Sequence, residues 1–148
     1  MLDLDCQILK ILSRNNGKAR LKTIQENIKQ KSGARVPLST INSSIERLEK
    51  SGYVNWVRYS PISLTEQGEN LANELLRHAQ LLEVLLFNEL DISAKDAHSE
   101  SEKLNLLLSC NIINKICEKY GHPSKCPCGD AILSSPTCFC EAEETKLN

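Results

Sequence analysis

Residues 37–64 have the sequence PLSTINSSIERLEKSGYVNWVRYSPISL, and this stretch decides the fold. Pro37 suits the first position of a helix. The apolar residues 38, 41, 45 and 48 recur at intervals of three and four, which predicts an amphipathic helix over residues 38–50 with that stripe buried. Gly52 then ends the helix. The β-branched and aromatic run 53–59, a Ser-Pro turn and residues 62–64 predict a short hairpin.

Two further helices are predicted before this stretch, over residues 2–14 and 21–29, each with apolar residues on one face. Asn15–Gly17 closes the first, and residues 30–36 form a polar turn that contains glycine. Helix, helix, turn, helix and hairpin in this order predict a winged helix-turn-helix over residues 1–66. In such a module the third helix enters the major groove and the hairpin lies along the backbone or minor groove.

The face of the third helix opposite its apolar stripe carries short hydrogen-bonding side chains and one guanidinium. Ser, Thr and Asn can reach base edges or phosphates, and an arginine can contact guanine through two hydrogen bonds. Lys18, Arg20 and Lys22 are predicted to contact phosphates. The predicted DNA-contacting residues of the third helix and the hairpin are Ser39, Thr40, Asn42, Ser43, Arg47 and Arg58.

The charge distribution supports this prediction. Residues 1–64 contain 11 Lys/Arg against 5 Asp/Glu, whereas residues 65–148 contain 7 against 14, within an overall net charge of −1. An excess of positive charge in one half is expected where that half meets phosphates. The alternative is a chance scatter of surface charges.

The second half predicts more helices and then an irregular tail. Thr65 can cap a helix that continues to about residue 90. Two more helices are predicted over residues 93–108 and 109–120. From residue 121 onward Pro, Gly, Ser and Cys dominate. We therefore predict a mainly α protein with a helical dimerisation domain over residues 67–121 and a Cys-rich tail over residues 122–148.

The composition excludes several classes of protein. Charged residues interrupt the apolar N-terminus, so it does not resemble a secretory signal. The longest apolar run is far shorter than the roughly 20 residues of a membrane span. We therefore predict a cytoplasmic protein with no membrane partner. The sequence also lacks a nucleophile–base pair, a phosphate loop and a metal-hydrolase motif, which predicts that it is not an enzyme and has no small-molecule substrate.

Seven cysteines without an export signal indicate reduced thiols, metal ligands or redox chemistry. Four of them form the pattern C-x-C-x9-C-x-C in the tail: Cys126, Cys128, Cys138 and Cys140. We expect these thiolates to converge on one tetrahedral centre, either Zn²⁺ or an iron–sulfur cluster. The alternative is an acidic tail whose cysteines have no role. Cys6, Cys110 and Cys117 are reserve ligand candidates. Cys110 and Cys117 lie seven residues apart on one predicted helix, about 10 Å at 1.5 Å per residue, which is too far for one mononuclear site, and both are predicted to be core residues.

Four stretches resemble the diphtheria-toxin-repressor family of iron- and manganese-dependent regulators. They are residues 48–68 with LEKSGYV, Tyr59 and LTEQG, residues 77–86 with RHAQLLEVLL, residues 98–109 with HSESEKLNLLLS, and residues 121–129 with GHP and CP-x-G. The resemblance covers about residues 1–132. It implies a homodimeric winged-helix regulator that binds a divalent metal and fits two recognition helices to a palindromic operator.

The resemblance also implies two metal sites for Fe²⁺ or Mn²⁺. Its primary site maps onto Cys6, Glu102, Asn105 and Leu106, where leucine has no donor atom and the Asn amide is a weak ligand. Its ancillary site maps onto Glu83, His98 and Ala79, with His78 one position away. We therefore expect a degenerate helical site, with Cys6, His78, Glu83, His98 and Glu102 as secondary ligand candidates.

Together these observations predict a transcription regulator, most simply a repressor, that binds double-stranded DNA. Its response to iron or redox state would pass through the C-terminal cysteines. The alternative hypothesis keeps the winged helix as a protein-interaction module without DNA binding, with the tail as a structural zinc knuckle.

Overall fold

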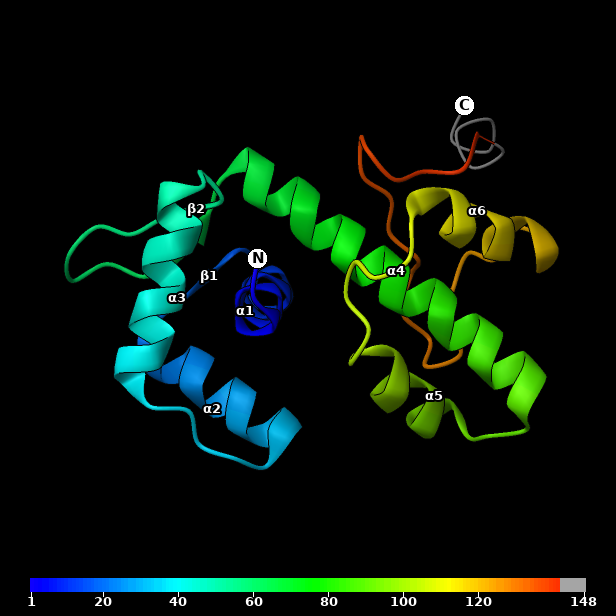
Figure 1. Cartoon of the computed structure of the whole chain (residues 1–148), viewed down its shortest axis with the longest axis horizontal. Coiled ribbons are helices and arrows are strands. Elements are labelled where there is room, and N and C mark those ends of the chain that lie inside the picture. The colour runs from blue at the N-terminus through cyan, green and yellow to red at the C-terminus, as the bar shows by residue number, and fades with distance from the viewer. Residues whose placement is uncertain (142–148) are drawn as a thin grey trace. The chain divides into compact units, whose positions relative to one another are not determined.

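The computed structural model describes residues 1–141, and these divide into two compact units. The first unit is Met1–Ala72, and the second begins at Asn73. The long helix α4 (Glu66–Leu90) begins in the first unit and continues in the second (Figure 1). The tail, through residue 141, belongs to the second unit and does not form a third.

The first unit is a winged helix-turn-helix, as predicted. Its remaining elements are α1 (Asp3–Arg14), β1 (Lys18–Ala19), α2 (Leu21–Ser32), α3 (Leu38–Lys50), β2 (Val54–Asn55) and β3 (Ile62–Leu64). The strands form an antiparallel sheet in the order β1-β3-β2, with Ala19 opposite Ile62 and Val54 opposite Leu64. The sequence did not indicate β1, because two residues are too few to show an alternating pattern.

The core of the first unit is mainly aliphatic. Ile8, Leu12 and Ile24 are fully buried, and Ile41, Ile45 and Leu48 of α3 join them at 0–1% exposure. Leu38 was predicted to belong to this buried stripe, and that prediction is wrong because its side chain is 38% exposed. All three residues of the first turn of α3 are exposed, so the buried stripe begins one turn later.

The start of α4 is fixed to the wing by two contacts. The Thr65 hydroxyl accepts a hydrogen bond from the backbone N–H of Gly68 at 3.1 Å and donates one to the Gly52 carbonyl at 2.6 Å. Gly68 has no space for a side chain, because a Cβ there would lie 1.9 Å from the Tyr53 carbonyl oxygen. Thr65 thus caps α4 as predicted.

The second unit contains the rest of α4, α5 (Ala94–Ser101) and α6 (Cys110–Lys119). The helix predicted over residues 93–108 is wrong in its length, because α5 ends at Ser101. The chain after α5 is irregular, and it contains three leucines that are 36–78% exposed: Leu104, Leu106 and Leu107. Two more helical turns would bury little apolar surface within this chain, and burial is what stabilises most short helices.

The tail follows an irregular but well-defined path on α4 and α6. Arg77 donates hydrogen bonds to the Leu133 carbonyl at 3.1 Å and to the Asn114 side chain at 2.9 Å. Asn114 in turn donates to the Phe139 carbonyl at 2.8 Å. Gln80 bonds both the Ala131 carbonyl and the Leu133 N–H. Within residues 1–141 none of the helices has the length and apolar character needed to cross a membrane.

Candidate metal centres

All seven cysteines lie in the described part of the chain, and the structure joins no two of them in a disulfide. Six of them, all in the second unit, gather with histidine and carboxylate side chains into three groups of potential metal ligands. Within each group the potential ligand atoms lie within 4.8 Å of one another. These groups are described in turn.

The first group consists of Glu83, Cys126 and Cys128, with His98 beside it. Glu83 on α4 is 1% exposed, and one of its carboxylate oxygens lies 3.6 Å from the Cys128 sulfur and 3.6 Å from His98 Nδ1. The Cys126 and Cys128 sulfurs are 2.9 Å apart, and His98 Nδ1 is 3.9 Å from the Cys128 sulfur. We call these four residues the thiol–carboxylate group.

A tight turn presents the two cysteines of this group. The Gly129 N–H donates to the Cys126 carbonyl at 2.8 Å, and Gly129 has a φ of 98°, which favours glycine. Burial raises the pKa of the Cys128 thiol to about 12, and its hydrogen bonds to Cys126 and Glu83 act in the same direction. A bound cation would reverse this preference by stabilising the thiolate.

The second group consists of Glu74 and His78 on α4, Cys110 at the start of α6, and Cys138 in the tail. His78 Nε2 lies 3.4 Å from the Cys138 sulfur and 3.6 Å from the Cys110 sulfur. The Cys110 sulfur lies 3.2 Å from Glu74 Oε1. We call these residues the α4–α6 group.

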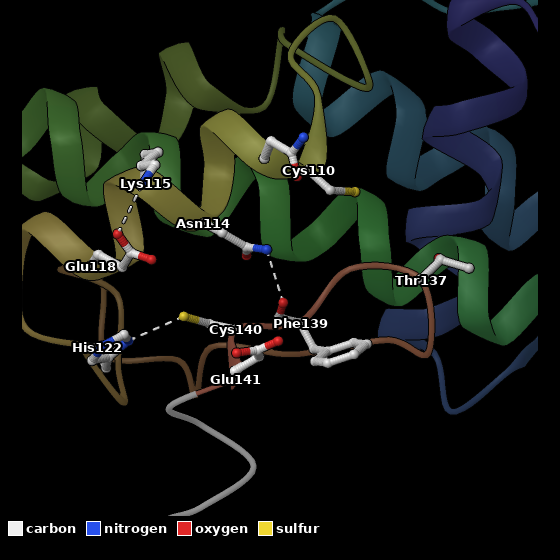
Figure 2. A pocket seen from close by; sticks show the side chains of 10 residues that line it. Cys110, Asn114, Lys115, Glu118, His122, Thr137, Phe139, Cys140 and Glu141 are labelled. Carbon is white, nitrogen blue, oxygen red and sulfur yellow. Dashed lines mark hydrogen bonds and ion pairs between the residues drawn. The ribbon is translucent and has the colours of Figure 1, made fainter.

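The third group consists of Cys117, His122 and Cys140. His122 Nδ1 lies 3.4 Å from the Cys117 sulfur and 3.3 Å from the Cys140 sulfur. His122 and Cys140 also line a pocket beside α6, and Figure 2 shows them on one side of Asn114 with Cys110 on the other. This third group offers three donors. The α4–α6 group offers four, and the thiol–carboxylate group offers four when His98 is included.

The structure therefore differs from the single four-cysteine centre expected for the tail. Cys126 and Cys128 lie together, but Cys138 and Cys140 each join a different group. The reason is that the tail meets the helices at separate levels: Cys126 and Cys128 face Glu83, whereas Cys138 faces His78. Glu83 lies about 7.5 Å further along α4 than His78 at 1.5 Å per residue. No group within residues 1–141 supplies the four cysteines typical of an iron–sulfur cluster.

The sequence missed Glu74 and His122 as partners of the tail cysteines, and it indicated Cys110 and Cys117 only as reserve candidates. One usable signal was present for the α4–α6 group, because Glu74 and His78 are four residues apart and share a helix face. Cys110 and Cys117, seven residues apart, also share a face of α6. They were correctly separated as too distant for one site, since each belongs to a different group.

Comparisons with known proteins identify the second unit. Residues 65–134 match the family described as "Iron dependent repressor, metal binding and dimerisation domain". The HTH-type transcriptional regulator MntR of Lysinibacillus sphaericus is 28% identical over 108 residues, which cover 73% of each chain. The iron-dependent repressor IdeR of Mycobacterium tuberculosis is 24% identical over 63% of this chain and 40% of its own length.

Solved structures of metal-dependent repressors also resemble this chain. A manganese-dependent transcriptional repressor in complex with manganese is 30% identical, with a TM-score of 0.75 over 86% of this chain and 57% of that one. Residues 65–134 thus match the iron-dependent-repressor domain, and the chain is similar to iron- and manganese-dependent repressors. The resemblance found in the sequence is therefore confirmed, as is the mainly α fold. These relatives are regulators, in agreement with the prediction that the chain is not an enzyme.

The primary metal site implied by the family does not fit this chain. Leu106 has no donor atom and is 40% exposed. Cys6, in the first unit, is 6% exposed, and burial raises the pKa of its thiol above the usual value of 9.0. Glu102 Oε1 lies 3.9 Å from His98 Nε2. The implied ancillary position fits better, because Glu83 and His98 are already in contact there and two thiols join them.

The structure places the predicted DNA-contacting residues on an accessible face of the first unit. Ser39, Thr40 and Ser43 are exposed, Asn42 is half-buried, and Arg58 is exposed beside the Tyr59 ring. Arg47 is already engaged within the unit. Its Nη2 lies 2.9 Å from Asp5 Oδ1 and its Nε lies 3.4 Å from Asp5 Oδ2, a two-point ion pair that leaves the side chain 44% exposed.

Proposed function

We propose that this chain is a homodimeric repressor that binds double-stranded DNA through α3 and the wing, and that a divalent transition metal at the thiol–carboxylate group controls its DNA affinity. The family supports regulation and metal dependence in general terms. The observation that carries the choice of site is the contact of Glu83 and His98 with the Cys126–Cys128 turn.

The donor set indicates which metals this group would hold. Thiolate and imidazole ligands suit zinc and ferrous iron, whereas carboxylate-rich sites suit manganese. When bound, the metal supplies positive charge that keeps both thiols deprotonated. Glu83 holds the turn through its contact with the Cys128 N–H at 3.2 Å, so ligand binding and the path of the tail are coupled. We therefore propose zinc or iron as the effector.

The dimer surface is proposed from apolar side chains that the chain alone does not cover. Phe87 and Leu90 at the end of α4, Leu107 before α6 and Ile112 on α6 are 40–78% exposed. Exposed large apolar residues gathered within one unit are typical of an interaction surface. We expect sedimentation of the intact protein to give a dimer, and Leu107→Glu to give a monomer.

A twofold arrangement would place two copies of α3 about one DNA turn apart on a palindromic operator. Metal and DNA affinities are then linked, because a metal that favours the DNA-binding dimer must itself bind more tightly when DNA is present. Two separate measurements therefore test the linkage: the DNA affinity with and without metal, and the metal affinity with and without DNA.

The test uses the intact protein and a duplex chosen by selection from a random-sequence pool with zinc or ferrous iron present. We expect affinity to fall steeply with salt concentration, since binding releases counterions. Ser43→Glu should weaken binding by at least about tenfold, because it brings a carboxylate toward phosphates. Ser99→Glu, an exposed helical serine in the second unit, is the matched control and should change affinity less than about twofold.

Cys126→Ser/Cys128→Ser should abolish the metal effect on DNA affinity while leaving metal-independent binding in place. Two results would contradict DNA recognition by α3 and favour a protein-interaction module. They are a DNA affinity that does not depend on salt concentration, and equal effects of Ser43→Glu and Ser99→Glu. A metal response that survives in the double variant would contradict the choice of site.

A further inference from the structure

The α4–α6 group differs from the thiol–carboxylate group in its position and in its dependence on the tail. Two of its members come from one face of α4, one from the first residue of α6 and one from the far end of the tail. The fold brings together residues that are distant in the sequence. Glu74 contacts Cys110, 36 positions away, and His78 contacts Cys138, 60 positions away. Chance surface clusters of acidic residues do not account for this, because His78 and Cys138 are each 1% exposed.

We propose that Glu74, His78, Cys110 and Cys138 form a tetrahedral zinc site that fastens the C-terminal segment to α4 and α6. This site is separate from the proposed effector site, and neither proposal depends on the other. Two thiolates, one imidazole and one carboxylate are a ligand set that zinc accepts. Four protein ligands leave no open position, which is typical of a structural site.

The distances match the edges of such a tetrahedron. Zinc bonds of about 2.3 Å to sulfur and about 2.0–2.2 Å to nitrogen or oxygen put neighbouring donors about 3.5–3.8 Å apart. The two contacts of His78 Nε2 with sulfur measure 3.4 and 3.6 Å, and the contact of Cys110 with Glu74 measures 3.2 Å. These three donor pairs are within a few tenths of an ångström of the tetrahedral spacing, and all the donor atoms of the group lie within 4.8 Å of one another.

The surroundings hold each ligand in position. Glu74 turns one oxygen toward Cys110, and its other oxygen accepts a hydrogen bond from the Thr137 hydroxyl at 3.2 Å. Cys138 sits in a tight turn in which its N–H donates to the Ser135 hydroxyl at 3.1 Å and its carbonyl accepts from the Ser135 N–H at 3.0 Å. Such outer contacts orient metal ligands.

The buried imidazole also points to a metal. Among residues 1–141 the hydrogen-bonding contacts of His78 are the two cysteine sulfurs at Nε2, and its Nδ1 is buried without a partner. Burial, the main influence, lowers the pKa of His78 below 6.5. A neutral buried ring facing two thiols gains little from hydrogen bonding alone.

The experiment isolates this site in the intact protein carrying Cys126→Ser/Cys128→Ser, purified without oxygen. We expect about one zinc per chain to remain after dialysis, and cobalt in its place to show the intense visible bands of a tetrahedral ion with thiolate charge transfer. Adding Cys138→Ser should remove both signals. Adding Ser134→Ala, which changes an exposed tail residue outside the three groups of potential ligands, should leave both signals in place.

A second variant guards against misfolding of the tail. His78→Gln leaves the tail sequence intact and should weaken zinc binding by at least about tenfold, as loss of one ligand contact does. Hydrogen exchange should show residues 131–140 losing protection on chelation in the parent, with no further loss in the His78→Gln protein.

Three results would overturn the site. They are no retained zinc in the Cys126→Ser/Cys128→Ser background, equal loss of zinc with Cys138→Ser and Ser134→Ala, or a Cys110–Cys138 disulfide in the protein as purified. The metal response of DNA binding is measured separately, so failure here is distinguishable from failure of the proposed effector site.

Discussion

The two compact units bury different kinds of side chain. In the first unit the core is mainly aliphatic and contains four buried polar side chains, Asp5, Lys10, Gln25 and Ser44, of which Asp5 is paired to Arg47. In the second unit Cys117, Cys138 and Cys140 belong to the hydrophobic core, beside buried Arg77, His78 and Glu83. Apolar burial stabilises without further partners, whereas buried polar groups cost free energy until hydrogen bonds or a metal satisfy them.

Residues 1–72 contain none of the groups of potential metal ligands, which implies that the first unit folds without a metal, whereas the second depends on its tail. The chain offers a separate probe for each unit. The single tryptophan, Trp56, lies in the first unit, and the three potential metal groups lie in the second. Trp56 fluorescence and a cobalt spectrum therefore report the two units independently.

The largest effect is expected from Gly68→Ala. The new Cβ would lie 1.9 Å from the Tyr53 carbonyl oxygen and 3.2 Å from a Leu64 methyl group, so backbone must move. We expect the first unit to lose about 3 kcal/mol, the upper part of the range for overpacking. Urea unfolding followed by Trp56 fluorescence measures this loss. An unchanged midpoint would contradict the close approach, and a parallel loss of the cobalt spectrum would contradict the independence of the units.

A smaller effect is expected from Arg47→Ala, which leaves the Asp5 carboxylate buried with Ser44 and the Leu2 N–H as its remaining partners. Because Arg47 is 44% exposed, we expect a loss of about 2 kcal/mol, below the range for fully buried pairs. Trp56 fluorescence again measures it, and Lys50→Ala on the same helix is the control. Asp5→Asn/Arg47→Ala should recover part of the loss.

This result would also change how DNA binding is tested. If Arg47 stabilises α1 against α3, lost DNA affinity in an Arg47 variant reports the fold as well as the contact. Ser43 avoids this difficulty because it is exposed, and its hydroxyl bonds only the Ser39 carbonyl of the same helix, at 3.1 Å.

In the second unit, Asn114→Ala should loosen the tail. It removes hydrogen bonds to Arg77 and to the Phe139 carbonyl, and we expect a cost of about 1 kcal/mol. Hydrogen exchange at residues 137–140 should accelerate while the Trp56 transition stays in place. Exposed Asn111→Ala, one turn earlier on α6, is the matched control. Equal exchange in both variants would show that the tail does not rely on Asn114.

The smallest effect is a dependence on acid. Burial disfavours ionised Asp5, but hydrogen bonds from Arg47, Ser44 and the Leu2 N–H outweigh it and lower the pKa below 3.8. Because the pKa of Asp5 is lower in the folded state than in the unfolded state, the ionised carboxylate stabilises the fold above about pH 4. This stability is lost as the pH falls through the pKa of Asp5 in the folded state. Urea midpoints from Trp56 fluorescence should fall below about pH 4, and less steeply in Asp5→Asn. Identical slopes would contradict the pair.

Much of the first unit was predictable because its elements are local. The spacing of Ile41, Ile45 and Leu48 within one helix is sufficient to indicate which face is buried, and Thr65 is sufficient to place the start of α4. The pairing of Arg47 with Asp5 was not predictable, because it joins residues 42 positions apart.

Local patterns in the sequence were sufficient to indicate the winged helix, the order of the helices, the likeness to metal-dependent repressors and the concentration of cysteines in the tail. Only the tertiary structure decided which donors those cysteines meet. Helical and strand periodicity arises from residues a few positions apart, whereas a metal centre is defined by the distances between atoms of separate segments. Cys138 and Cys140 are two positions apart in the sequence, yet they contact different histidines, because Cys138 faces His78 on α4 and Cys140 faces His122 after the end of α6.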